Sequence, residues 1–221
     1  MSAPGLVIFD CDGVLVDSEP ISMRELTRAI NAVDVEMSER EVSTVYAGGT
    51  LEAIQRDVSL RRGGPLPSGW IDDFYSARAE AFARELRPVA GARETVEAVQ
   101  RLGWETCIAS QARVVKMEQT LVLTDLADLF PPERVFSATM VRRPKPAPDL
   151  FVHAARECGW EPDACIVVED SVTGVRGARA AGMRVLGYAA RNRPEDEAMM
   201  LSAAGAQIVR DMREVPGRVA V

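Results

Sequence analysis

The sequence predicts an α/β fold, in which a parallel sheet carries helices on both faces and an all-helical domain is inserted near the N-terminus. Three observations lead to this prediction. Apolar runs alternate with helical patterns after Pro88, and such alternation is typical of a parallel sheet covered by helices. Residues 164–168, Ala-Cys-Ile-Val-Val, have the composition of a buried strand. Between residues 18 and 87 the patterns are helical, with no convincing strand.

The first predicted element is a strand over residues 6–9, an apolar run that stops abruptly at Asp10. Helices are expected next, starting with one from Pro20 in which apolar residues recur at steps of three and four. A second begins at Ser38, which is spaced from Glu41 as in a capping box. The others cover about 51–60 and 70–86. These helices predict a small helical domain over residues 18–87.

The rest of the chain alternates between the two kinds of element. Strands are predicted over residues 106–109, 135–136, 164–168 and 184–187, and helices over 92–99, 114–123, 150–158, 172–181 and 194–203. Residues 1–17 and 88–221 would therefore form one Rossmann-like core domain around the insertion. Ligands of such sheets bind beyond the carboxyl ends of the strands.

Composition narrows the functional class. The formal net charge of −7 argues against a protein that binds duplex DNA. No export leader and no apolar run of about 18 residues is visible, which favours a cytoplasmic protein with no membrane partner. The four cysteines form neither a CxxC pair nor a disulfide framework. Only two lysines, Lys116 and Lys145, occur among 26 basic residues, so a lysine in a special position stands out.

Polar residues with matching chemistry follow the predicted strands. They are Asp10 and Asp12 after the first strand, Ser110 and Gln111 after the second, Lys145 in an Arg-Pro-Lys-Pro loop, and Glu169 and Asp170 after the strand over 164–168. Each alone suits a turn, a helix cap or a solvated loop. Their co-occurrence in order, at the same edge of one sheet, favours a common site.

A phosphoryl-transfer site accounts for these groups together. Asp10 is the candidate nucleophile, and Mg²⁺ held by Asp10 and Asp170 would offset the charge of the phosphoryl group, as would Lys145. The Ser110 hydroxyl and the Gln111 backbone N–H are candidate donors to phosphoryl oxygens. Asp12 is the candidate acid and base.

The motifs resemble those of the haloacid dehalogenase superfamily along the whole chain. The resemblance is carried by Phe9-Asp10-Cys11-Asp12-Gly13 through Glu19, by Ile108-Ala109-Ser110, by Lys145-Pro146-Ala147-Pro148-Asp149 and by Val168-Glu169-Asp170-Ser171. More narrowly, the chain resembles β-phosphoglucomutase-like and 6-phosphogluconate phosphatase-like members. The resemblance implies Asp10 as nucleophile, Asp12 as acid–base group and carbonyl ligand of Mg²⁺, Asp170 as metal ligand, and Ser110 and Lys145 on the phosphate. Glu169 would be an outer partner of that site.

The resemblance also implies that residues 18–87 form a cap, and it places residues 47–50 where relatives have a substrate-specificity loop; a plain turn between two helices accounts for these residues equally well. The expected activity is Mg²⁺-dependent hydrolysis of a small phosphate monoester, such as a sugar or sugar-acid phosphate, by a monomer. A phosphosugar mutase remains an alternative, although the single histidine, His153, lies outside the helical insertion. A catalytically silent binding protein of the same fold is the other alternative.

Overall fold

The chain divides into two compact units, one formed by Met1–Asp17 with Arg87–Val221 and one by Ser18–Leu86. The computed structural model describes residues 4–46, 49–192 and 194–220. The division falls one residue before the expected boundary at residue 87. Ala47 and Gly48 of the expected specificity loop lie outside the described residues.

The larger unit is built on a parallel sheet of six strands in the order β3-β2-β1-β4-β5-β6. The strands are β1 (Leu6–Phe9), β2 (Glu105–Ser110), β3 (Val135–Ser137), β4 (Cys165–Glu169), β5 (Arg184–Tyr188) and β6 (Gln207–Val209). The predicted α/β fold is confirmed, and β6 is an additional edge strand that the sequence pattern did not predict. In this strand order the direction of winding reverses beside β1, where ligands of such sheets bind.

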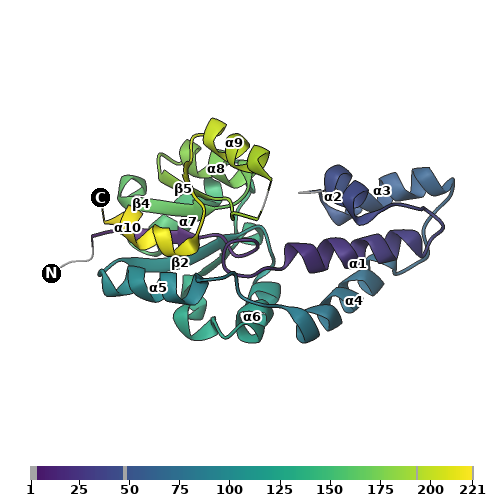
Figure 1. Ribbon diagram of the computed structural model, residues 1–221, viewed down its shortest axis with the longest axis horizontal. Helices are drawn as coiled ribbons and strands as arrows, with labels where there is room; N and C mark the ends of the chain where they lie inside the picture. The colour runs from purple at the N-terminus through teal and green to yellow at the C-terminus, as the bar shows by residue number, and fades with distance from the viewer. Residues whose placement is uncertain (1–3, 47–48, 193, 221) are drawn as a thin grey trace. The chain divides into compact units, whose positions relative to one another are not determined.

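Alternate residues of each strand enter one of two hydrophobic cores, because neighbouring side chains of a strand point to opposite faces. Val7 and Phe9 pack into a core with residues of α5 (Ala92–Arg101), α6 (Val114–Leu123) and α10 (Val215–Val219). Leu6 and Ile8 pack into the other, with α7 (Asp149–Glu157), α8 (Val172–Ala180) and α9 (Glu195–Ala203). Figure 1 shows α5 and α6 on one side of the sheet and α8 and α9 on the other. Burial on both faces fixes the sheet rigidly behind its carboxyl edge.

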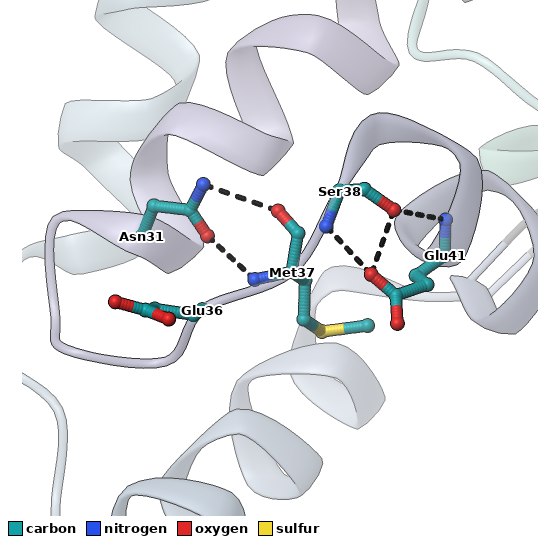
Figure 2. A pocket seen from close by; sticks show the side chains of 5 residues that line it. All are labelled: Asn31, Glu36, Met37, Ser38 and Glu41. Carbon is teal, nitrogen blue, oxygen red and sulfur yellow. Dashed lines mark hydrogen bonds between the residues drawn. The ribbon is translucent and has the colours of Figure 1, made fainter.

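The smaller unit consists, over its described residues, of helices α1 (Glu19–Asn31), α2 (Glu39–Tyr46), α3 (Leu51–Arg62) and α4 (Trp70–Glu85). The predicted capping box is present at the start of α2: the Ser38 backbone N–H donates to Glu41 Oε2 at 2.8 Å, and the Glu41 N–H donates to Ser38 Oγ at 3.3 Å. Figure 2 shows this box beside Asn31, whose amide bonds the Met37 backbone twice. These bonds fix the connection between α1 and α2.

Within the described residues, every helix is too short or too polar to cross a lipid bilayer.

Candidate active site

Lys145 lies at the centre of a buried ionic cluster. Its Nζ lies 2.6 Å from Asp10 Oδ1 and 2.5 Å from Glu169 Oε1, and it donates to the Ala109 carbonyl at 2.9 Å. The Lys145 side chain is 1% exposed, and the Phe151 ring lies 4.9 Å from its ammonium. The structure therefore brings together Asp10, Lys145 and Glu169, which sequence reasoning placed at one site.

The sheet itself aligns these groups. Phe9 pairs with Ile108 of β2 on one side and with Val168 of β4 on the other. Asp10, Ala109 and Glu169 are the residues that directly follow these three paired residues. They therefore lie next to one another at the carboxyl edge of the sheet. The Asp10 backbone N–H donates to the Val168 carbonyl at 2.9 Å, so the chain stays in register there.

One ammonium lies between two buried carboxylates, and burial and charge together shift the pKa values of Asp10 and Lys145. Burial raises the pKa of Asp10 to about 7, because the attraction of Lys145 only partly offsets the cost of desolvation. Burial alone would lower the pKa of Lys145, but the charges of Asp10 and Glu169 outweigh it and raise that pKa. Lys145 therefore stays protonated, and the two carboxylates beside it would attract a further positive charge.

Ser110 and Gln111 lie beside this cluster on the β2 side. Ser110 is buried, and its Oγ accepts from the Ala112 backbone N–H at 3.3 Å. The Gln111 amide donates to the Lys145 carbonyl at 3.5 Å, which ties the end of β2 to the lysine loop. Both residues thus lie where sequence reasoning expected donors to a phosphoryl group.

Asp12 and Asp170 lie around the turn that follows β1. Gly13 has a positive φ of 78°, and a Cβ at this position would lie 1.9 Å from Asp170 Oδ2. The Asp170 carboxylate therefore rests against the backbone of the turn that carries Asp12. The Asp12 side chain is 33% exposed and pairs with Lys116 from α6.

Two contributors to this region were not predicted. The rarity of lysine in the chain marked Lys116 as unusual, but nothing in the sequence indicated that its partner would be Asp12. Ser137 is fully buried at the end of β3, and its Oγ donates to the Ala112 carbonyl at 2.7 Å. It holds the loop that follows Ser110. Nothing in the spacing of a three-residue edge strand marks such a serine beforehand.

A metal ion here would need ligands beyond side chains. Among residues 4–46, 49–192 and 194–220, no three carboxylate, imidazole or thiol groups lie close enough to hold an ion by themselves. The Asp170 carboxylate contacts Gly13 of the turn, and the Asp10 carboxylate lies at the start of the same turn. Such a set suits Mg²⁺, which typically binds one or two carboxylates and completes its octahedron with water and substrate oxygens.

Comparison with known proteins agrees with this geometry. Residues 4–182 match the family of haloacid dehalogenase-like hydrolases. A 6-phosphogluconate phosphatase of Escherichia coli is 32% identical over 197 residues, which cover 88% of this chain and 87% of that protein. Hexitol phosphatase B of Escherichia coli is 30% identical, with 91% of this chain and 92% of that protein covered.

Solved structures agree as well. A haloacid dehalogenase-like protein of Agrobacterium tumefaciens superposes with a TM-score of 0.83 at 34% identity, covering 98% of this chain and 97% of that one. A hydrolase of this family from Deinococcus radiodurans, solved with bound phosphate and sodium, superposes with a TM-score of 0.82 at 28% identity, covering 99% and 96%. The family resemblance read from the motifs is thereby confirmed: the chain belongs to the haloacid dehalogenase-like hydrolases.

Proposed function

We propose that this protein is a Mg²⁺-dependent phosphatase that hydrolyses a small sugar or sugar-acid phosphate through an aspartyl-phosphate on Asp10. The observation that carries the proposal is the buried Asp10 carboxylate, held 2.6 Å from the fixed cation Lys145 at the carboxyl edge of the sheet. The names of the two Escherichia coli relatives support phosphorylated sugar acids and sugar alcohols as the substrate class.

The residues divide the reaction between them. A carboxylate oxygen of Asp10 bonds to phosphorus while the bond from phosphorus to the sugar oxygen breaks. Asp12 gives its proton to the departing oxygen, and later takes one from the water that attacks the aspartyl-phosphate and regenerates Asp10. Lys145, the Ser110 hydroxyl and the Gln111 N–H bind and orient the phosphoryl oxygens.

The donor chemistry of the turn fits a magnesium ion. The Asp10 and Asp170 carboxylates and the Asp12 backbone carbonyl would hold it, with Glu169 fixing Lys145 beside them. Bound there, Mg²⁺ would supply positive charge to the phosphoryl oxygens. The excess of carboxylates over ammonium groups in the cluster supports this assignment, because the single ammonium of Lys145 pairs with both Asp10 and Glu169.

The helical unit, residues 18–86, is proposed to act as a cap over the substrate. The mutases that this chain resembles use, besides the aspartate pair, a histidine of the helical insertion. The only histidine, His153, lies on α7 of the larger unit and packs edge-on against Phe136 at 5.5 Å. Hydrolysis is therefore favoured over mutase activity. The four free thiols suit a reducing cytoplasm, and one chain carries all the proposed site residues, so a monomer suffices.

The test is phosphate release from a panel of sugar and sugar-acid phosphates and from p-nitrophenyl phosphate. The Asp10→Asn variant should release no phosphate, and acid-quenched wild-type protein should carry a phosphoryl group on Asp10 by peptide mass spectrometry. Asp163→Asn, which removes the same charge at an exposed position, is the matched control and should retain activity. Wild-type turnover by Asp10→Asn would refute the nucleophile, and a rearranged sugar phosphate in place of free phosphate would indicate the mutase.

A further inference from the structure

The first turn of α6 contributes a charged residue to the proposed site. Lys116 Nζ donates to Asp12 Oδ1. The Lys116 side chain is 18% exposed and that of Asp12 is 33% exposed, so the lysine is the more buried partner. An ammonium withdrawn from water needs a compensating anion, and Asp12 supplies it.

A second contact fixes the rotation of α6 about its axis. Thr120 follows Lys116 by four residues, so the two side chains lie on the same face of the helix. The buried Thr120 hydroxyl donates to the Met117 carbonyl at 3.0 Å and lies beside the thiol of Cys11, the residue directly before Asp12, where it partly offsets the rise that burial causes in the pKa of that thiol. Met117 is fully buried in the core beneath. The helix therefore meets the turn after β1 at two points one helical turn apart.

The position of Lys116 within the helix is unfavourable for a cation. It is the third residue of α6, and the first turn of a helix carries a partial positive charge. That turn holds no acidic residue, and the residue that caps it is Arg113. A lysine at this position does not stabilise the helix itself. The ion pair with the Asp12 carboxylate, in contrast, explains why a cation is found here.

We propose that Lys116 is a positioning residue: its ammonium, bonded to Oδ1, holds the Asp12 side chain in the conformation in which Oδ2 carries the proton and reaches the leaving oxygen. This inference rests on the proposed function, because it assigns Lys116 to the residue that transfers the proton. Lys116 acts through Asp12 and not on the phosphoryl group, which distinguishes it from Lys145.

The choice of substrate separates these roles. An alkyl phosphate needs its leaving oxygen protonated, whereas p-nitrophenolate leaves without a proton. Lys116→Met should therefore lower kcat/KM for the best sugar phosphate about tenfold more than for p-nitrophenyl phosphate, within the range that a positioned general acid contributes. Inhibition by inorganic phosphate should be unchanged. Lys116→Arg should restore part of the lost selectivity, and Arg113→Met, which removes a charge at the start of the same helix, should not reproduce the pattern.

Other outcomes overturn the inference. Equal losses on both substrates together with weaker phosphate inhibition would mean that Lys116 binds the phosphoryl group. Equal losses of activity on both substrates with a lowered Tm would mean that Lys116 has a structural role only. If Lys116→Met folds poorly, the same comparison of the two substrates is made with Lys116→Arg.

In a protein that already carries Asp12→Asn, Lys116→Met should lower kcat/KM no further. A wild-type protein that releases no phosphate would count against the proposed function itself, whereas an active protein with unselective Lys116 variants counts against this inference alone.

Discussion

Gly13 and Asp170 lie in direct contact, although they are far apart in the chain. A Cβ on Gly13 would lie 1.9 Å from Oδ2 and 2.8 Å from Cγ of Asp170. The glycine is therefore needed twice, once for its positive φ of 78° and once for the space that Asp170 occupies.

Gly13→Ala tests both needs together. The left-handed backbone costs a residue with a Cβ roughly 1–2 kcal/mol, and the methyl group must in addition displace the Asp170 carboxylate. Activity per folded molecule should fall by about tenfold or more, equivalent to about 1.4 kcal/mol in the barrier. Urea unfolding and phosphate release are the two measurements.

Gly63→Ala is the matched control. Gly63 also has a φ of 78°, but a Cβ there meets nothing within 4 Å. The control should lose comparable stability and keep its activity per folded molecule. Equal activity losses in both variants would show that backbone strain, and not the contact with Asp170, is responsible.

Lys145→Met should destabilise the protein in a pH-dependent way. Without the ammonium, Asp10 and Glu169 remain buried with no cation between them, which costs about 3–5 kcal/mol when both are ionised. The pKa of Asp10 is already raised to about 7 in the folded protein, and loss of Lys145 raises it further. A folded-state pKa above the unfolded value of 3.8 means that the folded protein binds the extra proton, so stability is regained as the pH falls.

Urea unfolding of wild type and Lys145→Met at pH 8 and pH 5 measures this effect. The difference in unfolding free energy should be larger at pH 8. Adding Glu169→Gln to Lys145→Met removes one of the two carboxylates left without a cation, and should recover part of the lost free energy of unfolding. A pH-independent difference would mean that lost packing against Phe151, and not charge, dominates.

The sequence was sufficient for most of the sheet because its strands are buried on both faces. Leu6–Phe9 is a continuous apolar run followed directly by Asp10, and Cys165–Glu169 is apolar up to its last residue, Glu169, so both the strands and the edge that carries Asp10 could be predicted. Strand β6 could not, because it is a three-residue edge strand that begins with the exposed Gln207. Strand ends are marked in a sequence by the abrupt change from apolar to polar.

The contact between Lys116 and Asp12 could not be predicted in the same way. Lys116 lies within a helix, and its partner depends on how α6 is rotated against the turn after β1. That rotation is set by packing, through the buried side chains of Met117 and Thr120. Hydrophobic periodicity gives the buried face of a helix, but it does not identify which loop a polar residue beside that face will meet.

Removal of divalent cations should abolish catalytic activity while the protein stays folded. Chelation should abolish phosphate release, added Mg²⁺ should restore it, and Ca²⁺ should substitute poorly because its coordination is larger and less regular. Independently of turnover, Mg²⁺ should raise the Tm of the wild-type protein by mass action. Asp170→Asn should lose this shift and Asp163→Asn should keep it. A Tm shift that survives in Asp170→Asn would remove Asp170 from the proposed ligands.

Cys158 should be the most reactive of the four cysteines. Hydrogen bonding to Cys107, together with the guanidinium of Arg134, lowers the pKa of the half-buried Cys158 thiol to about 7. Burial raises the pKa of the thiols of Cys11, Cys107 and Cys165 instead. Since the thiolate is the nucleophile, alkylation by iodoacetamide should modify Cys158 first. Its rate should rise with pH around a midpoint near 7, as read by peptide mass spectrometry.

Two variants identify the cause of that reactivity. Arg134→Met removes the nearby positive charge and should move the midpoint to higher pH, because the thiolate is then less stabilised. Cys107→Ala removes the hydrogen bond that contributes most to the lowered pKa and should move the midpoint further in the same direction. Cys165→Ala leaves both groups in place and should leave the midpoint near 7. If Cys158 reacts no faster than Cys165 at pH 7, then Cys107 and Arg134 do not activate it.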